Sequence, residues 1–154
     1  MKETERIRDQ MRRAFQGEAW HGPSLRELLD GVSARQAAQR PLGAAHTIWE
    51  LVLHIAVWED VVRRRLGGEQ ISELAADRDW PQLHDRGEAS WRETLEALER
   101  GHQRLLAAVE GLTDQRLTET VRGESYSAYA MLHGLIQHDL YHAGQIALLK
   151  KALA

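Results

Sequence analysis

Residues 127–153 read SAYAMLHGLIQHDLYHAGQIALLKKAL, and this stretch decides the fold. Its apolar residues recur with the period of an α-helix, so the sequence predicts one long helix here, entered from Tyr126. His138 and His142 interrupt the apolar pattern four residues apart and therefore lie one turn apart on the same helix face. Two neutral imidazoles at this spacing can bind one divalent metal ion.

Three more long helices are expected upstream, because apolar residues recur there at helical spacing: Glu5–Gln16, Thr47–Leu66 and Glu88–Val109. The connections between them, residues 17–46 and 67–87, are long for a helix bundle. Short helices are expected in these connections after Ser24 and Ser33, each with a capping-box partner three residues later, and around Ile71–Ala76. The predicted fold is all-α, a four-helix bundle with long connections that carry short helices.

The composition is that of a globular protein with one domain over residues 1–154, since 43% of the residues are hydrophobic and 28% are charged. The formal net charge is -3, so no overall positive field attracts nucleic acid or an anionic membrane. No stretch approaches the roughly 18 apolar residues of a membrane span, and residues 1–6 lead into no signal-peptide core. We therefore expect a cytoplasmic protein that binds neither nucleic acid nor membranes.

The chain contains no cysteine. This excludes disulfides, thiolate zinc sites, iron–sulfur clusters and a cysteine nucleophile. Thiol chemistry would therefore require a thiol that arrives as a cosubstrate.

A catalytic metal site needs a third protein ligand besides His138 and His142. The best candidate is His54, which interrupts the apolar run IWELVLHIAVW of residues 48–58. No spacing ties His54 to the C-terminal pair, and a core histidine hydrogen-bonded to a neighbour is an alternative. The pair itself has the alternative of two unrelated surface or core histidines. Buried imidazoles need polar partners in any case, because an unpaired buried polar group costs about a few kcal/mol.

The chain resembles the DinB/YfiT-like superfamily, a group of metalloenzymes of the damage-inducible type. The resemblance rests on IWELVLHIAVW at residues 48–58 and on HDLYHAGQI at residues 138–146. It extends to WHGPSL at residues 20–25 and to Trp80-Pro81, and so covers essentially the whole chain.

This resemblance implies a four-helix bundle in which one histidine of the second long helix and two of the last bind a divalent metal ion. Zinc or nickel is typical of the group, and water completes the coordination shell. By motif position the implied ligands are His54, His138 and His142. Similar members are often dimers, which implies a homodimer here.

Characterised members of the resembling superfamily include thiol-dependent transferases and isomerases, together with proposed hydrolases. The resemblance therefore implies a divalent-metal-dependent transferase or hydrolase that acts on a small molecule, with a low-molecular-weight thiol as a candidate cosubstrate. The alternative is a non-catalytic, metal-stabilised helical dimer that acts as a stress-response or binding module.

No general base is evident in the sequence. The candidates are Glu50, one turn before the candidate ligand of the second long helix, and His21 in the first connection. Gln145, three residues after His142, is a further candidate that would reach the site or orient a ligand, with a hydrogen bond between helices as the alternative. Asp139 points about 100° away from its neighbour on the helix, so we expect it to contact a neighbouring helix instead.

Other residues carry expectations about burial and packing. His102 is expected at the surface, and Trp20 and Trp80 are expected to line a pocket on the connections. Gly134 and Gly144 lie inside the last helix, where glycine costs about 1 kcal/mol relative to alanine. They indicate the close approach of a neighbouring helix or a ligand, with packing alone as the alternative explanation.

Overall fold

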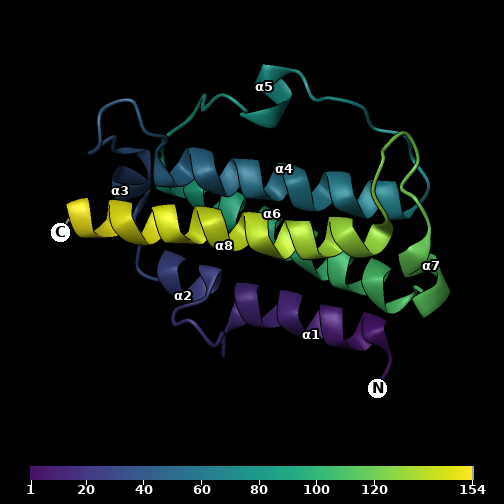
Figure 1. The fold of residues 1–154 in the computed structure, drawn as a ribbon. Helices are drawn as coiled ribbons and strands as arrows, with labels where there is room; N and C mark the ends of the chain where they lie inside the picture. Colours follow the sequence, from purple (N-terminus) through teal and green to yellow (C-terminus); the bar gives the residue numbers. More distant parts are fainter. Residues whose placement is uncertain (154) are drawn as a thin grey trace.

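The computed structural model describes residues 1–153, which are all-α (Figure 1). The four long helices are α1 (Glu3–Gln16), α4 (Ile48–Leu66), α6 (Glu88–Glu110) and α8 (Ala128–Leu153). The short helices are α2 (Leu25–Leu29), α3 (Ala34–Ala38), α5 (Ala76–Asp79) and α7 (Asp114–Thr118). The predicted bounds of the long helices are therefore confirmed to within two residues.

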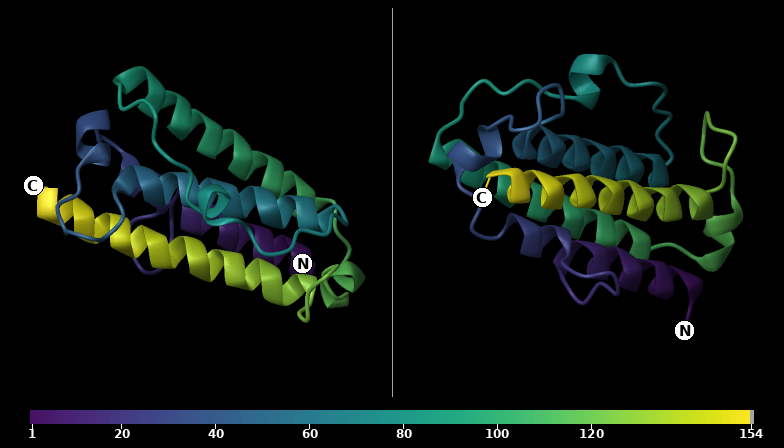
Figure 2. Two further views of the ribbon diagram at one scale, coloured as in Figure 1. Left: turned by 90° about the horizontal axis from the view of Figure 1, so that it is seen from above. Right: turned by 60° about the vertical axis from the view of Figure 1, so that its left-hand side comes forward.

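The long helices lie side by side along the molecule, and α1 and α4 each contact both α6 and α8. Figure 1 shows that α4 and α6 run in one direction while α1 and α8 run in the other. Because α4 and α6 are parallel, the connection between them crosses the length of the molecule, and Figure 2 shows it passing over α4 with α5 in its middle. This arrangement is compatible with the predicted four-helix bundle and brings α5 against the outer side of α4.

Capping boxes start three of the helices. The Thr47 hydroxyl accepts a hydrogen bond from the backbone N–H of Glu50, and the Glu50 carboxylate accepts one from the backbone N–H of Thr47, at 3.1 and 2.8 Å. The predicted boxes at Ser24 and Ser33 start α2 and α3 in the same way. The short helix expected around residues 71–76 was predicted too early in the chain, since α5 begins only at Ala76.

The core consists of two apolar clusters with a polar layer between them. One cluster contains Trp49 and Ile146, and the other contains Leu105 and Leu132. Along α4, α6 and α8, the segments between the two clusters carry the polar residues Glu59, His102 and Asp139. The bundle therefore has a polar centre between two apolar ends.

The longest helix, α8, lies with one face on the core and the opposite face toward solvent. A Cβ atom added at Gly134 or Gly144 would meet no atom within 4 Å among the described residues, so the expected close approach of a neighbouring helix at these glycines is wrong. Both glycines lie on the exposed side of the helix. Within residues 1–153, neither α8 nor any other helix combines the length and the apolar character needed to cross a membrane.

Candidate metal centre

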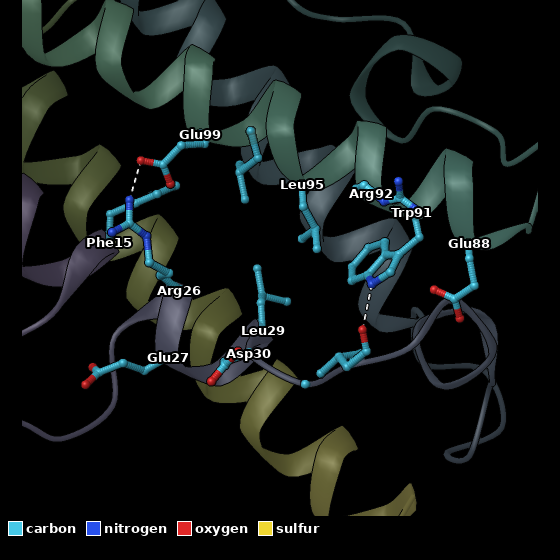
Figure 3. A pocket seen from close by; sticks show the side chains of 13 residues that line it. Phe15, Arg26, Glu27, Leu29, Asp30, Glu88, Trp91, Arg92, Leu95 and Glu99 are labelled. Atoms are coloured by element: carbon cyan, nitrogen blue, oxygen red, sulfur yellow. Dashed lines mark hydrogen bonds and ion pairs between the residues drawn. The ribbon is translucent and has the colours of Figure 1, made fainter.

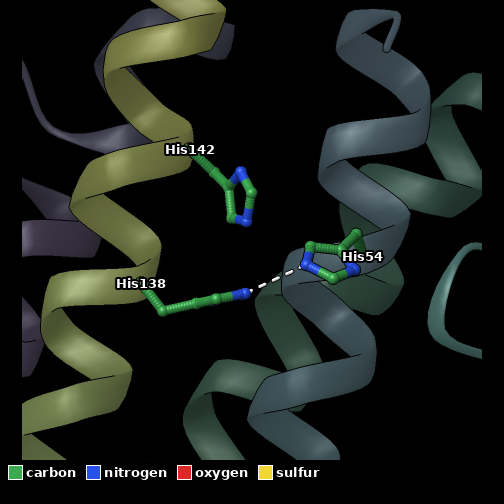
Figure 4. A group of neighbouring side chains, drawn as sticks. All are labelled: His54, His138 and His142. Atoms are coloured by element: carbon green, nitrogen blue, oxygen red, sulfur yellow. Dashed lines mark hydrogen bonds between the residues drawn. The ribbon is translucent and has the colours of Figure 1, made fainter. Parts of the chain in front are cut away.

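Three histidines meet where α4 packs on α8, and we call them the histidine triad: His54, His138 and His142. His54 comes from α4 and the other two from successive turns of α8, and Figure 4 shows the three rings pointing toward a common space. One ring nitrogen of each lies within 4.8 Å of those of the others. The Nε2 atoms of His54 and His138 are 3.0 Å apart. The tertiary structure thus joins the histidine of α4 to the C-terminal pair.

The other nitrogen of each ring faces an oxygen acceptor. Nδ1 of His54 lies 2.8 Å from the backbone oxygen of Asp79. Nδ1 of His138 lies 3.3 Å from Oδ1 of Asp139, and Nδ1 of His142 lies 2.6 Å from Oε1 of Gln145. A proton on each Nδ1 would be hydrogen-bonded to these oxygens, and this tautomer leaves the lone pair of each Nε2 available to a metal ion.

A divalent cation fits this donor set. Three Nε2 lone pairs that face one another repel unless a positive charge lies between them, and neutral imidazole nitrogen is a preferred ligand of zinc and nickel. Two nitrogens at about 2.05 Å from a tetrahedral metal ion lie about 3.3 Å apart, close to the separation of the His54 and His138 nitrogens. Burial lowers the pKa of His142, which keeps that ring neutral and able to bind a metal.

Comparison with protein families agrees with this geometry. The sequence profile of the DinB superfamily matches residues 19–146, a range that includes the whole histidine triad. The chain belongs to the DinB superfamily. The resemblance inferred from the histidine motifs is therefore confirmed, while α1 lies outside the matched range. No curated protein and no solved structure matches the chain significantly.

The connection between α4 and α6 covers the triad in this DinB superfamily member. The Trp80 ring stacks on His54 with 3.8 Å between centroids, and it stacks on His46 with 3.6 Å on its other face. Asp79 accepts a hydrogen bond from Trp58 Nε1 at 2.8 Å through its carboxylate, and its backbone oxygen lies within hydrogen-bonding distance of His54 Nδ1. Trp80 was expected to line a pocket and does lie at the site. The contribution of Asp79 was not predicted, because a backbone oxygen leaves no signature in the sequence.

A buried chain of ionisable groups extends from the triad into the polar layer of the core. The carboxyl group of Asp139, next to His138, interacts with that of Glu59 on α4. Oε1 of Glu59 lies 2.8 Å from Nδ1 of His102 on α6. Glu59 and His102 are each only 1% exposed. The expectation that Asp139 contacts a neighbouring helix fits this arrangement, whereas the expected surface position of His102 is wrong.

Two spacings in the sequence could have revealed these buried groups. Glu59 lies four residues after Ile55 and three before Val62, and His102 lies four residues after Leu98, so both fall on the apolar stripe of their helix. A charged or ionisable residue on such a stripe is buried when a neighbouring helix supplies a partner, as happens here.

Burial decides the protonation of this chain of groups. It raises the pKa of Glu59 to about 8 and that of Asp139 to about 8, and it lowers the pKa of His102 to about 4. Oε2 of Glu59 is buried and meets no hydrogen-bond donor within residues 1–153. Because both pKa values are raised above 7, the neighbouring carboxyl groups of Glu59 and Asp139 hold at least one proton between them at neutral pH.

Glu50 and His21, the candidate bases predicted from the sequence, are not part of the histidine triad. The Glu50 carboxylate caps α4 and pairs with Arg40 at 2.6 Å, which holds it at the start of the helix. His21 is exposed in the connection between α1 and α2. Trp20 beside it is fully exposed, so the expectation that it lines a pocket is wrong.

Several cavities are large enough for a small molecule. One of them, about 530 Å³, opens between α2 and α6, with Leu29, Trp91 and Leu95 in its wall and the Arg26–Glu99 ion pair at its edge (Figure 3). Among residues 1–153, none of the three triad histidines lies in the wall of this cavity. Another cavity, about 390 Å³, lies between α4 and α8, and His138 forms part of its wall. This smaller cavity therefore adjoins the candidate metal centre.

Proposed function

We propose that this member of the DinB superfamily is a divalent-metal-dependent enzyme that acts on a small molecule, with zinc or nickel bound by His54, His138 and His142. The observation that carries the proposal is the geometry of the triad: one ring nitrogen of each histidine lies within 4.8 Å of those of the others, while each Nδ1 lies beside an oxygen. A divalent ion held by neutral imidazoles keeps its full positive charge and can lower the pKa of a water or thiol that binds to it.

Of the two reaction classes, transfer to a thiol is better supported than hydrolysis. Hydrolysis needs a side chain that accepts a proton from water. Asp79 and Asp139, the carboxyl groups beside the triad, are already engaged by imidazole and indole N–H groups. A thiol, with an ordinary pKa of about 8.5, ionises more easily than water and depends less on such a base. Because the chain has no cysteine, the thiol would be a low-molecular-weight cosubstrate.

Thiol consumption tests this proposal directly. Protein purified without a histidine tag is loaded with zinc or nickel and mixed with glutathione or free cysteine and the electrophile chlorodinitrobenzene. We expect the thiol to disappear faster than in buffer, and this acceleration to vanish after chelation and in His54→Ala. Hydrolysis of nitrophenyl acetate without any thiol would favour the hydrolase instead. Metal-loaded protein that accelerates neither reaction would contradict the proposed enzymatic function.

Gln145 is expected to support metal binding by orienting His142. Gln145→Ala removes the oxygen that lies 2.6 Å from Nδ1 of His142. Loss of such an orienting partner lowers metal affinity about 10-fold to 100-fold. Competition against a chromophoric chelator measures the affinity, and Gln137→Ala, at an exposed position of α8, is the matched control. Equal affinities of the two variants would show that Gln145 does not act on the centre.

The second candidate function is a non-catalytic homodimer in which the metal serves stability. Tyr141 and Leu148 support self-association, since they are 67% and 59% exposed and lie two turns apart on the outer face of α8. In such a protein His138→Ala would lower the melting temperature along with metal content. A folded His138→Ala variant with unchanged melting and no metal, or a monomer in light scattering, would count against it.

A further inference from the structure

The cavity between α4 and α8 is an apolar pocket that begins at the candidate metal centre. Trp58 and Val62 of α4 face Met131 and Leu135 of α8 across it, and His138 closes one side. Its volume of about 390 Å³ lies within the usual range for small-molecule sites. A molecule that reaches the histidine triad through this pocket therefore buries an apolar portion beside it.

One charged side chain, Arg65, lines the pocket within the described part of the chain. Its guanidinium pairs with the Glu124 carboxylate at 2.7 Å and donates to the Tyr126 hydroxyl at 2.7 Å, and it lies 6.0 Å from the ring centroid of Trp58. The charge is therefore already neutralised. A ligand in the pocket therefore meets no unbalanced charge.

We infer that this pocket binds the substrate and selects an uncharged molecule that carries an aryl or alkyl group. The inference rests on the proposed function, because the bound molecule is a substrate only if the protein is an enzyme. The pocket itself is formed without the metal ion. An anionic group is disfavoured there, because Glu124 already balances Arg65 and the rest of the wall is mostly apolar.

Gly134 offers a way to close the pocket without touching the triad. It lies in the pocket wall one turn before His138, and a Cβ atom placed on it would meet nothing within 4 Å among the described residues. A leucine at this position would project into the empty space of the pocket. Gly144 lies on the same helix in equally open surroundings but not in the pocket wall, so Gly144→Leu is the matched control.

Ligand-observed NMR with benzylacetone, a neutral ketone with an aryl group, tests the inference. The isosteric carboxylate hydrocinnamate is the comparison ligand. Both are titrated into chelator-treated protein, where no metal contributes to affinity, and into zinc-loaded protein as a second measurement. We expect benzylacetone to bind the chelator-treated wild type and the Gly144→Leu variant alike. In Gly134→Leu its affinity should fall about 10-fold or more, and hydrocinnamate should bind the wild type about 10-fold more weakly than the ketone.

Three results would overturn the inference: no binding of benzylacetone to wild type, equal binding to Gly134→Leu, or hydrocinnamate binding as tightly as the ketone in chelator-treated protein. Metal content is measured by elemental mass spectrometry on the same samples. If the pocket binds the ketone as expected while no zinc-loaded sample, variant or wild type, retains metal, the proposed function fails and the ligand pocket stands. If metal binds but Gly134→Leu changes nothing, only the pocket assignment fails.

Discussion

His54→Ala is expected to abolish stoichiometric metal binding. Wild-type protein purified without a tag should carry about one zinc or nickel ion per chain, and the variant should lose at least about 100-fold in affinity because only two ligands from one helix remain. His54 is the ligand that joins α4 to α8, so its loss also separates the two halves of the centre. Elemental mass spectrometry of the purified proteins, followed by chelator competition, measures both quantities.

The matched control is His84→Ala, since this histidine is exposed and lies outside the triad. Its metal content should equal that of the wild type. Circular dichroism should show that His54→Ala remains helical, because the apolar clusters on both sides of the polar layer are unchanged. Retention of one metal ion per chain in His54→Ala would show that other residues bind the ion. It would also remove the basis for proposing an enzyme with a three-histidine metal site.

Glu59→Ala is expected to destabilise the fold strongly, whereas Glu59→Gln is expected to be nearly neutral at pH 7. Alanine leaves a cavity and deprives Asp139 and His102 of a buried partner, which together cost about 3 kcal/mol. For a chain of this length that loss lowers the melting temperature by about 6 to 12 °C. Glutamine keeps the shape, donates to Asp139 as the protonated carboxyl does, and still accepts from His102.

The pH dependence follows from the direction of the pKa shifts. Because the pKa of Glu59 is raised to about 8 in the folded chain, the folded state keeps a proton that the unfolded state releases above its ordinary value of 4.5. The stability that this group contributes is therefore complete below about pH 4.5 and is lost as pH rises through about 8. His102 acts in the opposite sense, because its pKa is lowered in the folded chain. It therefore reduces the stability of the fold only as pH falls below 6.5, the ordinary pKa of a histidine.

Melting temperatures of the wild type should therefore fall between pH 6.5 and 9, and Glu59→Gln should weaken this dependence. Thermal denaturation followed by circular dichroism over that range measures it, with Glu93→Gln at an exposed position of α6 as the control. If Glu59→Gln were as unstable as Glu59→Ala at pH 7, Glu59 would be ionised in the folded protein and paired with a charged His102.

Much of the local structure was predictable because its causes lie within a few residues. The period of the apolar residues predicts the long helices, and Ser24 and Ser33 with their capping partners predict the starts of α2 and α3. The juxtaposition of His138 and His142 follows from helix geometry alone. Gln145 was also placed correctly near His142, because three residues along a helix return to the same face.

The site as a whole depends on contacts between segments far apart in the chain. His54 meets the C-terminal pair only because α4 packs against α8, and no spacing in the sequence encodes that contact. Asp79 and Trp80 reach His54 because parallel α4 and α6 force their connection across the bundle. His102 was expected at the surface because an ionisable side chain is usually solvated, yet Glu59 on another helix supplies its partner.

The sequence by itself therefore determined the helices, their caps and the i, i+4 histidine pair, since hydrogen bonds and side-chain spacing within one segment decide these. The tertiary structure alone decided that His54 meets the C-terminal pair, which acceptor faces Nδ1 of His54, and the buried layer of Glu59, Asp139 and His102. These features depend on which helices pack together. Burial between packed helices changes the protonation of side chains, and the loss of water makes a polar partner necessary for each buried polar group.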